Sequence, residues 1–251
     1  MDEQIMTSLT QPGSSLLAIL TVLVASIPWV SSASEAPKPP YVVGGNQHII
    51  IGITLDEAAV RAALPEGLEP VADLTGGLNV YTSQGGHVAE PYTRSYVWAD
   101  VEGYDSVSGS KGRWILWAAT NPGADKLRHI GYGSVPGDTK LDRTEKTVSG
   151  STTVDGAEVM NVQIELTGEA CSPAVGTLNY PSKLDLTGPL VVTQFAWSGS
   201  FCGANPVSAN ISVADDHPLS KYKPTALTWA AFAEDLGFSV SPQFPQEAAG
   251  N

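Results

Sequence analysis

The stretch RWILWAATNPGADKLRHIGYGSVPGDTKLD, from Arg113 to Asp142, holds the features from which we start. It begins with an aromatic run in which Trp114 and Trp117 flank two apolar residues, and the turn sequence Asn-Pro-Gly follows. A glycine-rich loop then leads to Lys140. An apolar run that ends in such a turn is typical of a β-strand. If the protein carries out covalent chemistry, Lys140 is the residue expected to perform it.

The β pattern extends to both sides of this stretch. Apolar or alternating runs are bounded by Gly, Pro, Asn and Asp, and Asp155-Gly156 has the composition of a hairpin turn. So many strands at short spacing predict a closed barrel or a sandwich, because both limit exposed sheet edges. The expected strands are His48 to Ile53, Leu78 to Thr82, Thr93 to Val101, Arg113 to Thr120, Lys146 to Val154, Glu158 to Leu166, Gly176 to Tyr180, Leu190 to Phe201 and Val207 to Val213.

Two helices are expected beside the strands. The segment Leu55 to Leu64 follows Thr54, which forms a capping box with Glu57, and Pro65 ends it. A second helix is expected from Pro224 to Gly237, because its alanines and leucines supply a broad apolar face and glycine suits a C-cap. The expected fold class is therefore α+β, mainly β.

The N-terminal segment has the pattern of a secretory signal peptide. Residues Leu16 to Ala25 form an apolar run, shorter than the about 20 residues that a membrane-spanning helix needs. Small residues suited to cleavage follow it, although the segment begins with acidic rather than basic residues. An uncleaved anchor is the alternative. We expect a signal peptide at 1–36, one domain at 37–242, a disordered tail at 243–251, and secretion or a secretory-pathway lumen as the location.

Two further features agree with secretion. Cys171 and Cys202 are the only cysteines, and in a secreted chain they would form one disulfide, with two buried thiols as the alternative. Asn210 begins an N-glycosylation sequon, which has meaning only in a eukaryotic source.

Charge and motifs exclude several classes of function. The net charge of −13 argues against nucleic acid and anionic membranes as partners. The four histidines are scattered without metal-binding spacing, and neither a P-loop nor a strand-linked dinucleotide motif is present. Ser134 does not stand in a G-x-S-x-G motif, which gives a serine hydrolase little support. No metal or other cofactor is expected. Whether the chain forms a homo-oligomer is an open question at this point.

The order of motifs resembles the acetoacetate decarboxylase-like family. Residues 56–70, DEAAVRAALPEGLEP, have the form D-x-x-x-(V/L)-x-x-x-L-P-x-G-L-x-P with which that family opens its domain. The segment Tyr92 to Ser95 resembles the family's Tyr-x-Glu-Ser, and Gly131 to Lys140 resembles its lysine-bearing loop. The resemblance spans about Tyr41 to Pro242. It implies a closed or nearly closed antiparallel β-barrel with flanking helices around an apolar pocket.

The family's founding chemistry, as the resemblance implies it, is an imine between a lysine and a ketone substrate. The attacking amine must be unprotonated, so desolvation or a nearby cation must lower its pKa. A gap-free alignment from Gly131 places Lys140 at the imine-forming position, with Thr139 in place of an adjacent lysine. An alignment from the other end of the loop places Ser134 and Val135 there and leaves no nucleophile.

The acidic residues of the family's pocket are missing here. Arg94 stands in place of the glutamate in the Tyr-x-Glu segment. Tyr81 and Thr82 stand where the other acid is expected. These losses argue against ordinary acetoacetate decarboxylation.

The candidate site combines catalytic and aromatic residues. The catalytic candidates are Lys140, Arg94 and His129, each of which has a solvated surface position as its alternative. The aromatic candidates lie on expected strands and would form a flat apolar cavity if they point inward, or ordinary core if they do not. They are Tyr92, Tyr96, Trp98, Trp114, Trp117 and Trp197.

Three functions fit these expectations. The first is a cofactor-independent lyase that acts on a β-keto or polyketide-like molecule through an imine at Lys140. The second is a non-covalent cyclase or pericyclase of natural-product biosynthesis in the same pocket. The third is a secreted barrel that binds an apolar ligand without catalysis. We prefer the two enzymes because the resemblance is to enzymes.

Overall fold

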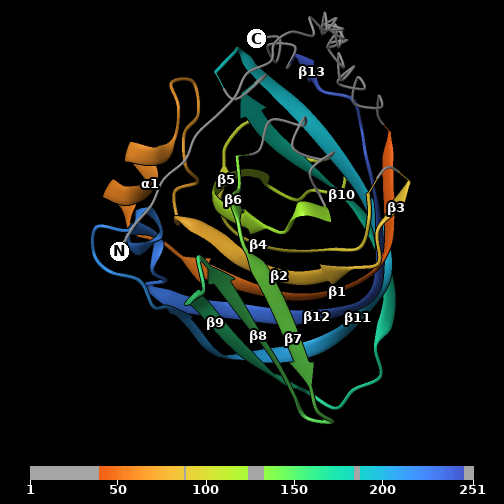
Figure 1. The fold of residues 1–251 in the computed structure, drawn as a ribbon. Helices are drawn as coiled ribbons and strands as arrows, with labels where there is room; N and C mark the ends of the chain where they lie inside the picture. Colours follow the sequence, from red (N-terminus) through yellow and green to blue (C-terminus); the bar gives the residue numbers. More distant parts are fainter. Residues whose placement is uncertain (1–39, 88, 124–132, 184–186, 246–251) are drawn as a thin grey trace, which may run out of the picture. The chain divides into compact units, whose positions relative to one another are not determined.

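The computed structural model describes residues 40–87, 89–123, 133–183 and 187–245 (Figure 1). These residues all belong to one compact unit, Ala36–Asn251. The expected signal peptide, His129 and residues 246–251 of the expected tail lie outside the described residues. The first residues of that tail form a short strand, β13 (Phe244–Pro245), which pairs with Val191 and Val192.

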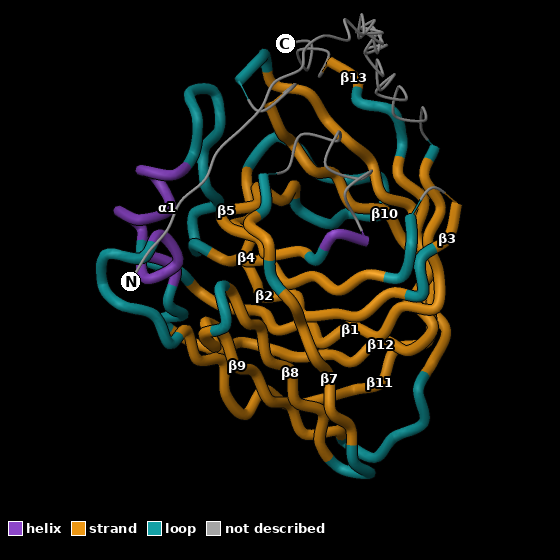
Figure 2. Tube along the Cα trace, viewed as in Figure 1, coloured by secondary structure: helices purple, strands orange, loops and turns teal. Residues whose placement is uncertain are grey.

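The described residues form one large sheet of 13 strands, and strands make up most of their length (Figure 2). All of the pairings are antiparallel except that of β5 with β6. The strand order is β6-β5-β4-β2-β1-β12-β11-β9-β8-β7, with β10 and β13 on β11 and β3 on β1. The bounds are β1 (Tyr41–Thr54), β2 (Thr75–Ser83), β3 (Gly86–His87), β4 (Tyr92–Val101), β5 (Gly112–Thr120), β6 (Val135–Pro136), β7 (Asp138–Arg143), β8 (Thr147–Val154), β9 (Ala157–Leu166), β10 (Ser172–Lys183), β11 (Leu190–Ile211) and β12 (Ala226–Val240).

The sheet is not closed into a barrel, which corrects the expectation from the sequence. Its order ends at β6 on one side and at β7 on the other, and these two strands do not pair within the described residues. Strand β8 instead packs onto the face of the central strands: a Cβ at Gly150 would lie 2.8 Å from Val80 and 3.2 Å from Ile49. The sheet therefore covers one of its own faces through side-chain packing rather than through ladder hydrogen bonds.

One α-helix, α1 (Glu57–Ala63), is found in the described residues where the first helix was expected. Its N-cap is Asp56, whose carboxylate accepts a hydrogen bond from the backbone N–H of Ala59 at 2.9 Å. The expected cap, Thr54, ends β1 and hydrogen-bonds the Thr225 hydroxyl. A short 3-10 helix, η3 (Pro218–Tyr222), precedes β12. None of the helices in the described ranges has the length and apolar character that a bilayer span requires.

The second expected helix is wrong, because that segment is strand β12 between β1 and β11. Ala230 and Phe232 lie in one core cluster, whereas Trp229 and Ala231 line a cavity on the other face. A strand that is covered on both faces has a nearly continuous apolar sequence. Such a run can be mistaken for a buried helix, since periodicity alone does not separate the two.

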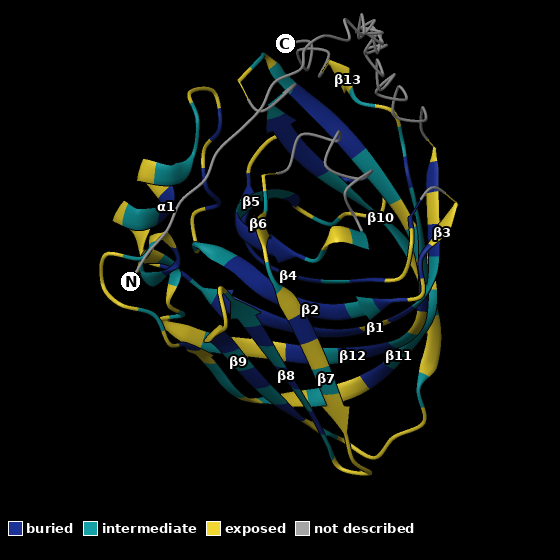
Figure 3. Ribbon diagram, in the orientation of Figure 1, coloured by how far each residue is buried: buried dark blue, intermediate teal, exposed yellow. Residues whose placement is uncertain are grey.

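The central strands divide the interior into two parts. On β1, Ile49, Ile51 and Ile53 pack into the larger core, which β8 and β9 cover, while His48 and Ile50 point to the opposite face. Strands β2 and β4 are buried along most of their length for the same reason (Figure 3). Because side chains alternate along a strand, the packing of one face fixes which residues reach the other.

Candidate ligand-binding cavity

The face opposite the larger core borders a cavity of about 240 Å³. Side chains from β1, β2, β4, β5, β10, β11 and β12 line it, and most of them are apolar or aromatic. Its polar members are two arginines, four tyrosines, a histidine, an asparagine and a serine. No aspartate or glutamate is found among the described residues that line it.

Strand β4 supplies the centre of the polar lining. Tyr92, Arg94 and Tyr96 alternate into the cavity, whereas Val97 lies in the larger core. This alternation settles the direction of Arg94, which is 9% exposed and lies with its Cζ 5.5 Å from the centre of the Tyr96 ring. The sequence left that direction open because both faces of β4 carry aromatic or apolar residues.

Hydrogen bonds between side chains link three strands beside the cavity. The Asn79 amide nitrogen on β2 donates to the Tyr96 hydroxyl at 2.8 Å, and Tyr96 and Tyr180 of β10 share a hydrogen bond of 3.0 Å. The Tyr81 and Tyr92 hydroxyls lie 3.4 Å apart. Burial raises the pKa of Tyr81, Tyr92 and Tyr96, so these phenols stay protonated and can donate hydrogen bonds.

The two arginines bring positive charge that no carboxylate in the described ranges neutralises through an ion pair. Burial by itself lowers the pKa of Arg113, but Tyr180, Tyr96 and Asp100 outweigh it and raise the pKa. The Arg113 guanidinium lies 4.3 Å from the centre of the Trp98 ring. The Asp100 carboxylate accepts hydrogen bonds from Trp98 and Thr75 instead. The cavity therefore favours a ligand that carries negative charge or a strong acceptor.

His48 is a further titratable residue of the cavity, beside the tyrosines and the arginines. It is 4% exposed and stacks on Tyr81 with ring centres 4.0 Å apart. Burial lowers the pKa of His48 to about 3, and the nearby Asn79 side chain acts in the opposite direction without offsetting that effect. The imidazole is therefore neutral near pH 7. The contact with Asn79 does not meet hydrogen-bond geometry, and neither ring nitrogen has a partner in the described residues.

Aromatic residues complete the lining from β11 and β12. Phe195, Trp197 and Phe201 come from β11, and the Trp197 and Phe201 ring centres lie 5.2 Å apart. Trp229 of β12 is 46% exposed although it lines the cavity, so it stands where the cavity meets the surface. Its ring lies on Gly52, where a Cβ would be 2.1 Å from the indole nitrogen. Glycine at that position therefore allows the indole to lie flat against β1.

Solved structures with a similar fold are known. The enduracididine biosynthesis enzyme MppR, complexed with pyruvate, has 13% identity and a TM-score of 0.67, over 88% of this chain and 96% of that one. Acetoacetate decarboxylase from Legionella pneumophila has 15% identity and a TM-score of 0.63, over 82% of this chain and 87% of that one. An acetoacetate decarboxylase-like enzyme from Sphingomonas wittichii has 15% identity and a TM-score of 0.60, over 84% of this chain and 94% of that one.

This chain has the acetoacetate decarboxylase-like fold. The resemblance that the sequence motifs indicated is thereby confirmed at the level of the fold. No protein-family model matches the sequence, and no curated protein matches it. At these identities the likeness is one of structure, and the chemistry must be argued from the residues of the cavity.

The structure does not place Lys140 in the cavity of this acetoacetate decarboxylase-like fold. Lys140 is exposed on β7, in a strand rather than the expected loop, and it is not among the lining residues. Its neighbour Thr139 points inward, is buried, and shares a hydrogen bond of 3.2 Å with Thr152. The expectation of an imine at Lys140 therefore loses its geometric basis.

The aromatic candidates divide between the two faces of the sheet. Tyr92 and Tyr96 line the cavity. Trp98 is buried beside Tyr96, at 5.7 Å between ring centres, but lies under Arg113 rather than in the lining. Trp117 packs into the larger core, and Trp114 is partly buried outside the lining. Trp114 and Trp117 are thus not cavity residues, because a bulge between β4 and β5 and the strand alternation turn them away.

Several cavity residues were not predicted from the sequence. They are His48, Asn79, Arg113 and Tyr180, together with Phe195 and Phe201 of β11 and the aromatic residues of β12. The signal for His48 was available, since the isoleucines that follow it at alternate positions mark the core face of β1. Asn79 and Tyr81 follow from the same alternation on β2. Tyr180 could not be found this way, because its position depends on how β10 lies against the rest of the sheet.

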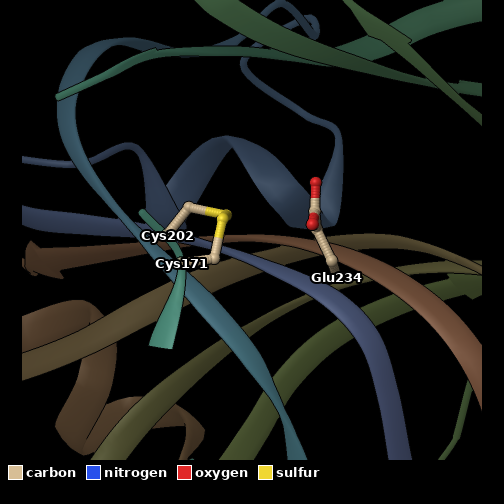
Figure 4. Close-up of side chains that lie close together, drawn as sticks. All are labelled: Cys171, Cys202 and Glu234. Carbon is tan, nitrogen blue, oxygen red and sulfur yellow. A yellow bond between two sulfur atoms is a disulfide. The ribbon is translucent and has the colours of Figure 1, made fainter. Parts of the chain in front are cut away.

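The expected disulfide between Cys171 and Cys202 is present (Figure 4). Glu234 lies beside it, and the ligand atoms of the three residues are within 4.8 Å of one another. A metal would need thiolates, whereas these two sulfurs are bonded to each other. Glu234 forms an ion pair with Arg143. Asn210 is exposed on β11, and its glycosylation stays a prediction.

Proposed function

We propose that this protein is a cofactor-independent enzyme that binds a small, flat, largely apolar molecule with an acidic or carbonyl oxygen and converts it without covalent attachment. The observation behind the proposal is the cavity lining of Arg94, Arg113 and buried tyrosines, in which the described residues include no carboxylate. Support for an enzyme comes from the fold, since MppR was solved with pyruvate and with the condensation product of pyruvate and imidazole 4-carboxaldehyde. Both are small carbonyl compounds or derive from them.

The chemistry of the lining suits reactions that develop negative charge on oxygen. Guanidinium groups bind carboxylates or enolates through paired hydrogen bonds. Protonated Tyr81, Tyr92 and Tyr96 can add neutral donors, and the apolar walls keep the local dielectric low. A lyase step on a β-keto acid and a ring closure of a polyketide-like chain both pass through such oxygen charge. Walls that fix one reactive conformer add to the rate in either case.

A second candidate function is ligand binding without catalysis. It is favoured by the predominantly aromatic lining and by Trp229, which is 46% exposed at the cavity. The two functions differ in what the arginines do. In an enzyme, removal of Arg94 lowers the rate constant for conversion of the bound substrate. In a carrier, it changes only the affinity for the ligand.

Replacing Arg94 with methionine is expected to weaken the binding of cinnamate, a flat aromatic acid, about 10- to 100-fold, because a hydrogen bond to a charged group contributes about 1.5–3 kcal/mol. Affinity is measured by quenching of tryptophan fluorescence. Methyl cinnamate should lose less affinity than cinnamate, since its carbonyl oxygen can accept a hydrogen bond but carries no negative charge. Arg61→Met is the control, because Arg61 is exposed on α1 and pairs with Glu57 and Glu69. Equal losses for acid and ester would show that Arg94 acts by packing, against the proposal.

The Lys140→Ala variant is expected to keep the wild-type affinity for cinnamate, because Lys140 lies outside the cavity lining. Borohydride treatment of the wild type with acetoacetate or pyruvate should give no adduct that is absent from the variant. Peptide mass spectrometry checks this result. A trapped adduct on Lys140 that the variant lacks would contradict non-covalent chemistry.

A further inference from the structure

The cavity contains a polar pair that the arginine chemistry does not use. His48 and Asn79 are both 4% exposed and both line the cavity. The two imidazole nitrogens and the Asn79 side-chain oxygen have no hydrogen-bond partner in the described residues. The Asn79 amide nitrogen is already engaged, since it donates to Tyr96 at 2.8 Å.

The unused atoms define what could satisfy them. A neutral imidazole offers one N–H donor and one acceptor nitrogen, and the asparagine oxygen adds a second acceptor. The arginines offer donors alone, so they select an anionic or carbonyl oxygen. The His48 and Asn79 pair instead selects a group that can donate a hydrogen bond and accept one. A hydroxyl does both, and an N–H group can serve the acceptors.

An apolar side chain would fill the position of His48 at lower cost. Phenylalanine has a similar shape and could stack on Tyr81 as the imidazole does at 4.0 Å. It would bury no unpaired polar atom, and an unpaired buried atom destabilises a fold. The nitrogens therefore serve something that enters the cavity rather than the packing of β1.

We infer that His48 and Asn79 form a second polar subsite, which binds a hydroxyl or N–H group of the ligand while its anionic oxygen meets the arginines. The ligand class is then a flat apolar acid or enol that also carries a hydrogen-bond donor. This inference rests on the proposed function and specifies its ligand. His48 acts here as a binding and positioning residue.

The subsite is tested with cinnamate and its 2-, 3- and 4-hydroxy derivatives as probes. In the wild type, at least one hydroxycinnamate is expected to bind about three- to tenfold more tightly than cinnamate, which is the contribution of one neutral hydrogen bond. In His48→Phe and in Asn79→Leu, the ratio of the two dissociation constants should fall to about one, since the hydroxyl loses its partner. The ratio is independent of any uniform change in affinity.

The matched control is His87→Phe, because His87 is exposed on β3 and outside the cavity lining. This variant should keep the wild-type ratio, and the melting temperature of each variant reports folding. A wild-type ratio of one, together with affinity that depends on Arg94, would overturn the subsite and leave the proposed function standing. A hydroxyl preference that survives in His48→Phe would also overturn the subsite. Failure of every acid to bind the wild type would overturn both.

Discussion

Replacing Cys171 and Cys202 together with alanine is expected to lower the free energy of unfolding by about 3–4 kcal/mol, the loop-closure entropy for a separation of 31 residues. The disulfide joins the residue before β10 to a β11 residue, Cys202, that is 3% exposed in the larger core. For a chain of this size the melting temperature should fall by about 10 °C. Thermal and urea unfolding with circular dichroism measure both values.

A second experiment reduces the disulfide of the wild type. Reduction should cause most of the decrease in the free energy of unfolding that is expected for the double alanine variant. Cinnamate affinity well below the melting temperature should stay at the wild-type value. The reason is that β10 remains paired with β11 from Ser172 to Lys183, and the cysteines do not line the cavity. If the double variant unfolds at the wild-type temperature, the disulfide does not constrain the unfolded chain as expected.

The sequence predicted those strands that have local signals. Alternating or apolar runs bounded by turn residues located β2, β4, β5, β8 and β9 to within a few residues. Strand β12 was missed because its order Ala226 to Leu236 is apolar on two faces, a pattern that a buried helix shares. The Thr54 capping box was also misleading, since Asp56 offers a competing cap two residues later.

The site was harder to predict because it depends on distant pairings. The motif match identified Tyr92 and Arg94, and the alternation of β4 places Tyr96 on the same face. Lys140 was placed by counting along a loop, but the segment pairs with β8 as a strand, and that register turns Thr139 inward and Lys140 outward. Closure of the barrel was inferred from the number of strands. The actual sheet curls onto itself through packing, which no local pattern encodes.

Replacing His48 with phenylalanine is expected to stabilise the unliganded protein by about 1–3 kcal/mol at pH 7.5, because it removes buried nitrogens without partners. This gain in stability over the wild type should increase as the pH falls. The pKa of His48 is about 3 in the folded state and 6.5 in the unfolded state. Below pH 6.5 the unfolded chain therefore binds a proton that the folded chain does not, and the wild type loses stability as the pH falls toward 3.

The size of the acid effect follows from the same two pKa values. At pH 4.5 the advantage of the phenylalanine variant should exceed its value at pH 7.5 by about 2–3 kcal/mol, since each pH unit below 6.5 contributes about 1.4 kcal/mol. Urea unfolding at both pH values measures the difference. The carboxylates and the other histidines are common to both proteins, so their titration cancels. His87→Phe serves as the control at an exposed position. If the difference in the free energy of unfolding between His48→Phe and the wild type does not change with pH, the folded protein protonates His48 as readily as the unfolded chain does. The conclusion that the imidazole in the cavity is neutral would then be wrong.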